Sequence, residues 1–435
     1  MTTQAWVAIA IFVASYIAIA TEKIDRTVVA LVGAALMLIV GSIDQADAFL
    51  HIDLNVIFLL AGMMIIVNII KRSGLFEWLA ISSAKLSKGR PLLLLIVLSL
   101  LTAVISAFLD NVTTVLLIAP ITLLIAGTLR VDPLPFLISE ALASNIGGTA
   151  TLIGDPPNII IGSAAKLGFN DFIIHLTPIV MLVLVVFLLS STFLFGKELR
   201  SRTPNVAALN DLNARKAIRD KYLVWKSLAI LGIVIVMFVL HEALHLMPAT
   251  IALGGAGLLL LASQLPPREK KTDPIETILA EIDWHTLFFF IGMFIMISGL
   301  ESTGVIKELL RIIIAANMGK VFLLSMIILW GSALLTFVTS SVPFVIAMLP
   351  VIRGLASQGV QPIEPLWWAL ALGACLGGNG TLIGAAANMV IAGISNKSGH
   401  KISFWAFAKK GMPTTIISLI LSSIYIWLRY FVLAR

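Results

Sequence analysis

Long apolar stretches recur along the whole chain, separated by short polar segments. An apolar stretch of about 20 residues forms a helix that spans the hydrocarbon core of a bilayer. Two apolar segments, 91–128 and 321–350, are each interrupted by a polar turn, and we expect them to enter the membrane, turn and leave without crossing it. Membrane crossings are predicted at about 5–20, 27–43, 54–70, 135–165, 172–196, 224–240, 249–263, 285–300, 366–395 and 413–432.

An internal repeat places equivalent residues at a constant spacing. In both copies a pair of glycines is followed by a Thr-Leu-Ile-Gly run and then by an asparagine, and this pattern in register indicates a duplication. Each copy has an odd number of predicted crossings, so the second copy inserts upside down, as in the inverted repeats of secondary transporters. The matching residues include Asp53 with Asp283, Gly147-Gly148 with Gly377-Gly378, Thr151 with Thr381, Gly154 with Gly384 and Asn158 with Asn388.

The predicted fold is an all-α polytopic membrane protein made of two inverted repeats. Each repeat has five transmembrane helices and one re-entrant helical hairpin, and one of its five helices is broken. We place the first repeat at 1–200, with its hairpin at 91–128 and its broken helix at 135–165. A cytoplasmic linker, 201–223, leads to the second repeat at 224–435, with its hairpin at 321–350 and its broken helix at 366–395.

Composition and charge support a membrane location. The chain is 59% hydrophobic and 12% charged, whereas a soluble domain has about 25% charged residues. If the loop 197–223 is cytoplasmic, 23 of the 30 Lys and Arg lie on the cytoplasmic side and the N-terminus is periplasmic. The net charge of +7 therefore reflects membrane topology, and we expect no nucleic-acid partner. Segment 301–320 fits this topology least well, since its basic residues are placed on the periplasmic side.

The polar interruptions carry the candidate transport chemistry. An unpaired backbone group in hydrocarbon costs several kcal/mol, so helix-breaking residues inside the membrane persist only against protein or a water-filled cavity. The ends of broken helices present amides to anions and carbonyls to cations. The predicted substrate- and ion-binding residues are Asp110, Asn111, Thr113, Thr114, Asn145, Gly147, Gly148, Thr149, Thr151, Ser340, Ser341, Gly377, Gly378, Asn379, Thr381 and Asn388.

Three acidic residues are candidates for coupling to protons or sodium, because a carboxylate inside a membrane usually has a transport role. They are Asp110, Glu140 and Asp155; Glu140 is open to the alternative of a solvated position near the cytoplasmic end. The glycines and threonines also fit a second interpretation, in which small residues only let helices pack closely. The single Cys375 excludes an intrachain disulfide, and one thiolate does not make a soft-metal site, so no metal or cofactor is predicted.

One motif points to a different class of protein. His241-Glu242-Ala243-Leu244-His245 matches H-E-x-x-H, which on a helix places two histidines for zinc, with the glutamate as general base. The motif lies at the end of an apolar segment just before Pro248, where a helix is expected to end. We keep an intramembrane zinc protease as the alternative from another class and favour a chance match in an aqueous loop. The prediction is that the chain is not an enzyme.

The chain resembles the ion transporter superfamily, especially its ArsB and P-protein (pink-eyed dilution type) permease branch. The resemblance rests on Phe108 to Thr114 (FLDNVTT) and on Asn145 to Asn158 (NIGGTATLIGDPPN). It implies a scaffold domain and a transport domain, with substrate held between hairpin tips and broken helices, and elevator-like movement. Carboxylate carriers of the superfamily have Ser-Asn-Thr at both tips. Here the tips read Asp110-Asn111-Val112 and Ser340-Ser341-Val342, and an aspartate at the tip would repel a carboxylate.

The expected function is efflux of arsenite or antimonite across the inner membrane, driven by the proton gradient. The alternatives are sodium–proton antiport and then transport of di- or tricarboxylates. The sequence has no G-x-x-x-x-G-K-[ST] motif, so any ATPase subunit would be a separate chain. A homodimer is left open. The other expected partners are the transported solute, protons or sodium, and the lipid bilayer.

Overall fold

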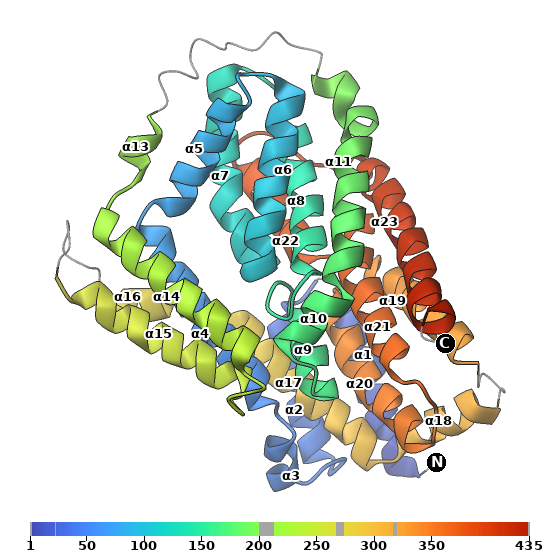
Figure 1. Cartoon of the computed structure of the whole chain (residues 1–435). Coiled ribbons are helices and arrows are strands. Elements are labelled where there is room, and N and C mark those ends of the chain that lie inside the picture. Colours follow the sequence, from blue (N-terminus) through green and yellow to red (C-terminus); the bar gives the residue numbers. More distant parts are fainter. Residues whose placement is uncertain (1, 22, 200–212, 267–273, 316–319, 434–435) are drawn as a thin grey trace.

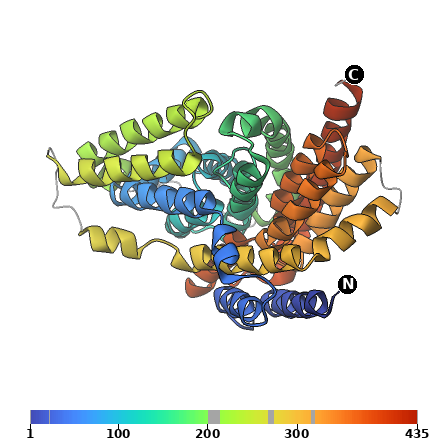
Figure 2. The same ribbon diagram turned by 90° about the horizontal axis from the view of Figure 1, so that it is seen from below.

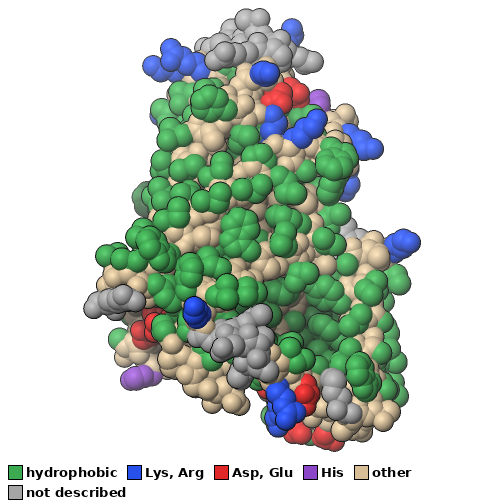
Figure 3. Space-filling view, turned by 90° about the vertical axis from the view of Figure 1, so that its right-hand side faces the viewer, with side chains coloured by type: hydrophobic (Ala, Val, Ile, Leu, Met, Phe, Trp, Pro, Cys, Tyr) green, Lys and Arg blue, Asp and Glu red, His purple; other side chains and the backbone are tan. Residues whose placement is uncertain are grey.

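A computed structural model describes residues 2–21, 23–199, 213–266, 274–315 and 320–433, and every regular element in these ranges is a helix. Figure 3 shows hydrophobic side chains over the middle of one face, with charged side chains toward its two ends. The prediction of an all-α membrane protein is confirmed. The eight described helices long and apolar enough to span a membrane are α1 (Thr3–Thr21), α4 (Leu54–Arg72), α6 (Pro91–Phe108), α7 (Asn111–Leu129), α11 (Thr177–Leu199), α14 (Lys221–Leu240), α17 (Trp284–Ser302) and α23 (Phe404–Trp427), which the π-helical turn η2 (Leu428–Val432) extends.

The remaining helices are shorter. Four of them are apolar: α2 (Arg26–Ile39), α15 (Pro248–Gln264), α19 (Val321–Thr336) and α20 (Ser341–Ser357). The segments around the predicted breaks are α8 (Leu134–Gly148), α9 (Pro156–Ala165), α21 (Glu364–Gly377), the 3-10 helix η1 (Gly378–Gly380) and α22 (Ala386–Lys397). The others are α3 (Gln45–Leu50), α5 (Leu75–Leu86), α10 (Phe169–His175), α13 (Ala214–Ala217), α16 (Ile275–Ala280) and α18 (Val305–Ala315).

The helix pairs and helix breaks lie close to where the sequence predicts them, with one difference in length. The second arm of the C-terminal pair continues to Ser357, so the predicted end at residue 350 was wrong. Pro350 is accommodated inside α20, because a proline removes only one backbone hydrogen bond and the neighbouring bonds persist. Similarly, α23 begins at Phe404 and contains Pro413, where a crossing was predicted to start.

Several segments predicted as loops contain helices. These are α3, α5, α16 and α18, within 41–53, 71–90, 264–284 and 301–320. Helix α3 begins where the Asp44 side chain accepts a hydrogen bond from the Ala46 amide (2.9 Å). A short helix with one apolar side resembles a polar loop in composition, so a search for membrane-length apolar runs misses it. Of the predicted linker 201–223, residues 201–212 lie outside the described residues.

Helices from the two halves of the chain pack against each other. Helix α4 lies along α15, and α17 lies along α2. In Figures 1 and 2 these pairs appear as blue ribbons beside yellow ones. Gly62 faces the backbone of Ala252 and Gly292 faces that of Ala30; a Cβ on either glycine would lie 2.7 Å from a backbone carbon. Small residues at these positions let the helix backbones come close, as is common in membranes. The two halves are therefore interlocked.

The broken helices run between two groups of helices. In Figure 1, α6, α7, α8 and α22 lie together in the upper part, and α9, α19, α20 and α21 lie together below them. Helix α6 packs on α8 and α19 packs on α21, while α22 contacts α7 and α9 contacts α20. Each broken helix therefore has one segment in each group, and both breaks lie where the groups meet.

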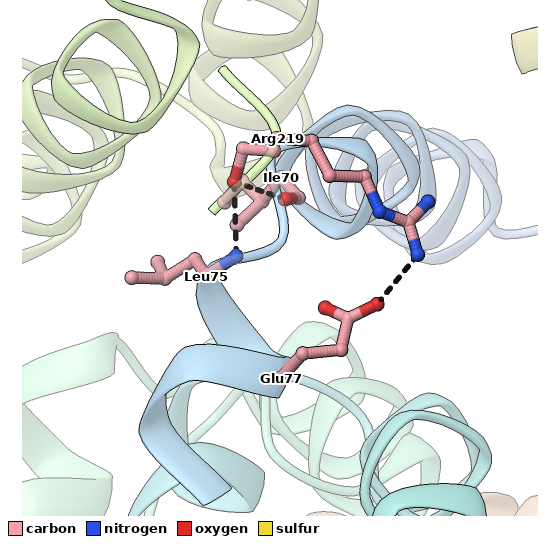
Figure 4. Close-up of polar contacts among 5 residues, drawn as sticks. Ile70, Leu75, Glu77 and Arg219 are labelled. Carbon is pink, nitrogen blue, oxygen red and sulfur yellow. Dashed lines mark hydrogen bonds and ion pairs between the residues drawn. The ribbon is translucent and has the colours of Figure 1, made fainter. Parts of the chain in front are cut away.

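The joint between α4 and α5 is held by the segment that follows α13 (Figure 4). Ser73 Oγ donates a hydrogen bond to the Ile70 carbonyl (2.6 Å), and Gly74 turns the chain with φ +82°. The Arg219 amide donates to the Ser73 carbonyl (2.9 Å), and the Arg219 guanidinium pairs with Glu77 at 3.1 Å. Residues on both sides of the joint are thus bonded to one distant segment.

Replacing Gly74 with alanine is expected to destabilise the fold more than replacing Gly304. Both glycines have positive φ, +82° and +79°, so the left-handed backbone strains either alanine. A Cβ on Gly74 would lie 1.9 Å from the Ala217 carbonyl oxygen, whereas one on Gly304 meets nothing within 4 Å. We predict a lower unfolding temperature for Gly74→Ala than for Gly304→Ala in detergent. Equal temperatures would show that Ala217 does not hold the joint.

Candidate functional site

Each helix break is fastened to the turn of the neighbouring helix pair. Thr151 Oγ1 donates a hydrogen bond to the Ala107 carbonyl, just before the turn between α6 and α7. In the C-terminal half, Thr381 Oγ1 donates to the Phe337 carbonyl (2.8 Å), at the turn between α19 and α20. The polar turns and the breaks therefore lie at the same level inside the molecule.

A cluster of buried asparagines connects the two breaks. Asn111 Nδ2 donates to Asn145 Oδ1 (3.0 Å), and Asn145 Nδ2 lies 2.9 Å from Asn379 Oδ1 and 3.0 Å from Asn388 Oδ1. Asn379 Nδ2 donates in turn to the Leu142 carbonyl (3.2 Å). The four side chains, at most 5% exposed, form this asparagine cluster across the two halves of the chain. Buried amides are costly unless they are paired, and here they pair with each other.

Two equivalent asparagines hold the unwound backbone of the breaks. Asn158 Nδ2 donates to the Thr151 carbonyl (2.8 Å). Asn388 Nδ2 donates to the carbonyls of Gly378 (2.8 Å) and Thr381 (2.9 Å). These carbonyls have no helical N–H partner at the breaks, and the side-chain amides donate to them instead. Both breaks are thereby fixed in shape.

Two cavities lie at the helix breaks, with Asp155 lining one and Ile383 the other. The smaller, of about 50 Å³, is the inner pocket, and the larger, of about 440 Å³, is the vestibule. Asp110, Asn111, Asp155 and Ser340 line the inner pocket; of these predicted site residues, Ser340 also lines the vestibule. Two of the three predicted coupling carboxylates and both polar turns thus meet at one pocket. Three polar side chains line both cavities: Arg26, Asp283 and Ser340. The inner pocket alone is also lined by Asp110, Asn111, Asp155 and Thr286, and the vestibule alone by Asp25 and Thr339.

The predicted glycines lie in helix contacts. A Cβ on Gly147 would lie 2.1 Å from the Ala103 carbonyl oxygen, and one on Gly377 would lie 2.6 Å from Ala333 Cα. Gly148 and Gly378 pack against the last glycines of their own breaks. None of these four glycines is among the residues that line the inner pocket or the vestibule in the described chain.

Four of the predicted threonines and serines line neither cavity in the described chain: Thr113, Thr114, Thr149 and Ser341. Asp110 Oδ1 caps α7 by accepting from the Thr113 amide (2.9 Å), and the next residue, Thr114, is fully buried. Thr149 Oγ1 donates to the Asn145 carbonyl (2.7 Å). Ser341, 9% exposed, starts α20 and lines neither cavity in the described chain.

Neither the predicted coupling residue Glu140 nor Cys375 lines the inner pocket or the vestibule in the described chain. Thr122 Oγ1 of α7 donates to Glu140 Oε1 at 2.5 Å, and Glu140 is fully buried, not solvated. The second oxygen, Oε2, has no hydrogen-bond partner among the described residues. Cys375 is buried in α21, with its Sγ 3.5 Å from Asn158 Oδ1. Of the predicted coupling residues, Glu140 therefore stands apart from Asp110 and Asp155.

The sequence analysis did not single out Arg26 or Thr286 as site residues, and it noted Asp283 only as part of the repeat. Arg26 Nη2 donates to Thr286 Oγ1 (3.3 Å), and its guanidinium lies 5.3 Å from the ring centroid of Phe289. Asp283 caps α17 by accepting from Thr286 N (3.1 Å) and Oγ1 (2.6 Å). One signal was present in the sequence: Arg26 directly precedes the predicted crossing 27–43, and the helix dipole disfavours a cation at a helix start.

The H-E-x-x-H sequence does not lie on a helix. Helix α14 ends at Leu240, and His245 has a left-handed backbone with φ +53°. His241 is buried, with its Nδ1 2.8 Å from the Phe238 carbonyl oxygen. The helical spacing that would bring two histidines to one zinc ion is therefore not formed.

Comparisons with known proteins agree with a membrane transporter. A family model described as "Citrate transporter" (CitMHS) matches residues 16–373. The chain is 45% identical over 433 residues to Uncharacterized transporter Rv2684 of Mycobacterium tuberculosis, covering 98% of this chain and 99% of that protein. It is 44% identical over 434 residues to a 46 kDa membrane protein of Mycobacterium leprae, with the same coverage.

A human protein is also similar. The chain is 32% identical over 507 residues to the P protein of Homo sapiens, which covers 98% of this chain and 60% of that protein. This similarity agrees with the resemblance to the P-protein permease branch that the segments 108–114 and 145–158 indicated. This chain belongs to the CitMHS family of the ion transporter superfamily, and it is a multi-pass membrane transporter and not an enzyme.

Proposed function

We propose that this protein is a secondary active transporter of the inner membrane that exports arsenite or antimonite in exchange for protons. In this proposal the solute binds in the inner pocket, beside the asparagine cluster. Protonation of Asp110 and Asp155 changes the affinity of the pocket between its two orientations, and this difference in affinity couples the two fluxes. The observation that carries the proposal is the meeting of both carboxylates with both polar turns at one pocket.

The two halves are proposed to be inverted repeats. Helices α3, α4 and α5 begin at residues 45, 54 and 75, and α16, α17 and α18 begin at 275, 284 and 305, a shift of 230 in each case. The caps support this assignment, since Asp53 accepts from the Val56 amide and Asp283 from the Thr286 amide. Contacts of α4 with α15, and of α17 with α2, pair the halves in a reciprocal way.

The same proposal gives the membrane topology. The N-terminus is periplasmic, the loop 197–223 is cytoplasmic, and the α6–α7 and α19–α20 pairs are re-entrant. The hydrogen bonds from Thr151 and Thr381 support re-entrance, because they keep each turn at the level of a break inside the molecule. Helices α6 and α7 are each also long enough to span a membrane, and the depth of the turn between them distinguishes a re-entrant from a spanning pair. We propose that movement is elevator-like.

The size of the inner pocket supports a small solute. A cavity of about 50 Å³ has room for only a few water-sized groups, since one water needs roughly 10–15 Å³ measured in this way. Arsenous acid is small, uncharged and able to donate and accept hydrogen bonds. The amide of Asn111 and the hydroxyl of Ser340 at the pocket offer such bonds without a charge conflict.

A second candidate is transport of a di- or tricarboxylate. The family model is described as a citrate transporter, and Arg26 lines the vestibule, where a guanidinium suits a carboxylate. The vestibule, at about 440 Å³, has room for such a molecule. The carboxylates of Asp110 and Asp155 would repel a carboxylate solute in the inner pocket, so this candidate ranks second.

Transport measured in proteoliposomes tests the proposal. We expect an imposed proton gradient to drive arsenite accumulation by the wild-type protein, and Asp110→Asn to reduce this accumulation to background because the group no longer releases a proton. The matched control is Asp47→Asn, which changes an exposed aspartate of α3 and should leave transport unchanged.

Parallel assays with sodium and citrate separate the alternatives. Accumulation of citrate without arsenite would favour the second candidate, and sodium–proton exchange without either solute would favour an antiporter. Full arsenite transport by Asp110→Asn would exclude Asp110 as the coupling residue.

A further inference from the structure

Arg26 is the one basic residue that lines the cavities in the described chain, and it lines both of them. It is the first residue of α2, half-buried, and belongs to the N-terminal half. The residues that hold it, Thr286 and Phe289, belong to α17 of the C-terminal half. The guanidinium therefore stands between the two halves, where the vestibule meets the inner pocket.

The contacts of Arg26 leave most of its hydrogen-bonding capacity open. A guanidinium has five N–H donors, and the described structure gives it one hydrogen-bond acceptor, Thr286 Oγ1. No carboxylate of the described residues lies within the 4 Å of an ion pair with Arg26, although Asp110, Asp155 and Asp283 line the same pocket. The side chain is thus held in place without being neutralised by a single partner.

The fold does not require a cation here. Helix α15 is the helix that meets α4 as α2 meets α17, and Ala252 on α15 has the packing role of Ala30 on α2. Each of these alanines lies four residues after the first residue of its helix, and α15 starts with Pro248 where α2 starts with Arg26. At these two corresponding positions, the charge is present in the N-terminal half only.

The charge balance of the pocket gives Arg26 a function. Three aspartates that line a small cavity inside a membrane protein make a strongly negative site, which attracts sodium as well as protons. A fixed guanidinium beside them lowers this negative potential and leaves proton binding as the way to neutralise the rest. A proton is also able to bind a single carboxylate, whereas sodium needs several oxygens around it.

We propose that Arg26 is a specificity-determining residue: a tethered cation that takes the place of sodium in the inner pocket and so restricts coupling to protons. The inference rests on the proposed function in placing coupling at this pocket. It does not depend on which solute is transported. It also assigns Thr286 and Phe289 as positioning residues, since they hold the guanidinium at the pocket.

Sodium binding to the purified full-length protein tests the inference. Isothermal titration calorimetry with sodium chloride against choline chloride is measured for the wild type, Arg26→Gln, Arg26→Lys and Arg311→Gln. We expect sodium binding by Arg26→Gln at an affinity about tenfold or more above that of the other three proteins, because one unit of nearby positive charge has been removed. Arg311, whose side chain is 80% exposed on α18, controls for the loss of charge alone.

A double variant tests where the sodium binds. Arg26→Gln with Asp283→Asn should lose the gained affinity, since a pocket carboxylate is neutralised. Thr286→Val separates charge from anchoring, because it removes the hydrogen bond that positions Arg26 and keeps the guanidinium, so its sodium affinity should lie between those of the wild type and Arg26→Gln.

Three results would overturn the inference: wild-type sodium binding as tight as that of Arg26→Gln, no sodium binding by a folded Arg26→Gln, or unchanged binding in the double variant. If Arg26→Gln does not fold, the wild-type titration decides the question: tight sodium binding by the wild type would exclude the inference, and its absence would agree with it. Absence of arsenite transport would contradict the proposed function and leave the sodium result standing by itself.

Discussion

Gly147→Ala is expected to prevent stable folding or to lower the unfolding temperature by many degrees. The added Cβ would lie 2.1 Å from the Ala103 carbonyl oxygen and 2.5 Å from Ala103 Cα, both backbone atoms of α6. No side-chain rotation relieves such a contact, so α6 and α8 must separate, and overpacking of this kind typically costs about 1–3 kcal/mol or more. Thermal unfolding in detergent and the yield of monodisperse protein measure the effect.

The chain offers a matched control for this substitution. Gly127 lies inside α7, and a Cβ there meets nothing within 4 Å. Alanine at this position should be neutral or slightly stabilising, since alanine exceeds glycine in helix propensity by roughly 1 kcal/mol. If Gly147→Ala and Gly127→Ala unfold at the same temperature, the close contact between α6 and α8 is not present in the protein.

Asn145→Ala is expected to abolish transport and to destabilise the protein. The substitution removes the partner of Asn111, Asn379 and Asn388 at once. A buried polar group left unpaired costs about 1–3 kcal/mol, so a loss of this size or larger is expected. Transport in proteoliposomes and thermal unfolding report the two effects.

The control for this experiment is Asn396→Ala, which changes an exposed asparagine near the end of α22. It should leave both transport and unfolding temperature unchanged. Wild-type transport by Asn145→Ala would show that the link between the two breaks is dispensable.

The sequence predicted the breaks and turns well because their residues act locally. Asp110 favours a helix start and indeed caps α7, accepting from the Thr113 amide. Pro156 lies at the first position of α9, where its missing N–H has no cost. Such signals depend only on neighbours in the chain, and a single sequence contains them.

Contacts between distant segments could not be predicted in the same way. The bond between Asn145 and Asn379 joins residues 234 positions apart, and it depends on how the two halves interlock. Arg26 was counted among loop charges, since nothing in its neighbourhood indicates that Thr286 and Phe289 lie beside it. The internal repeat predicts which residues of the two halves correspond to each other. It does not predict which helices of one half contact helices of the other half.

The predicted site residues also divide by physical role. Asp110, Asn111, Asp155 and Ser340 line the inner pocket, whereas Gly147 and Gly377 lie in backbone contacts between helices. From sequence, a glycine at a helix break fits both a binding role and a packing role. Only the position of Ala103, on another helix, distinguishes the two.

A cross-link between the two polar turns tests the central claim most directly. Val112→Cys and Ser340→Cys are combined in a Cys375→Ala background, because both positions line the inner pocket and the vestibule. A short bifunctional thiol reagent in native membranes should join them within one molecule, and transport should fall until a reductant removes the link. The absence of an intramolecular cross-link, or full transport with the link in place, would contradict a shared transport pocket built from both halves of the chain.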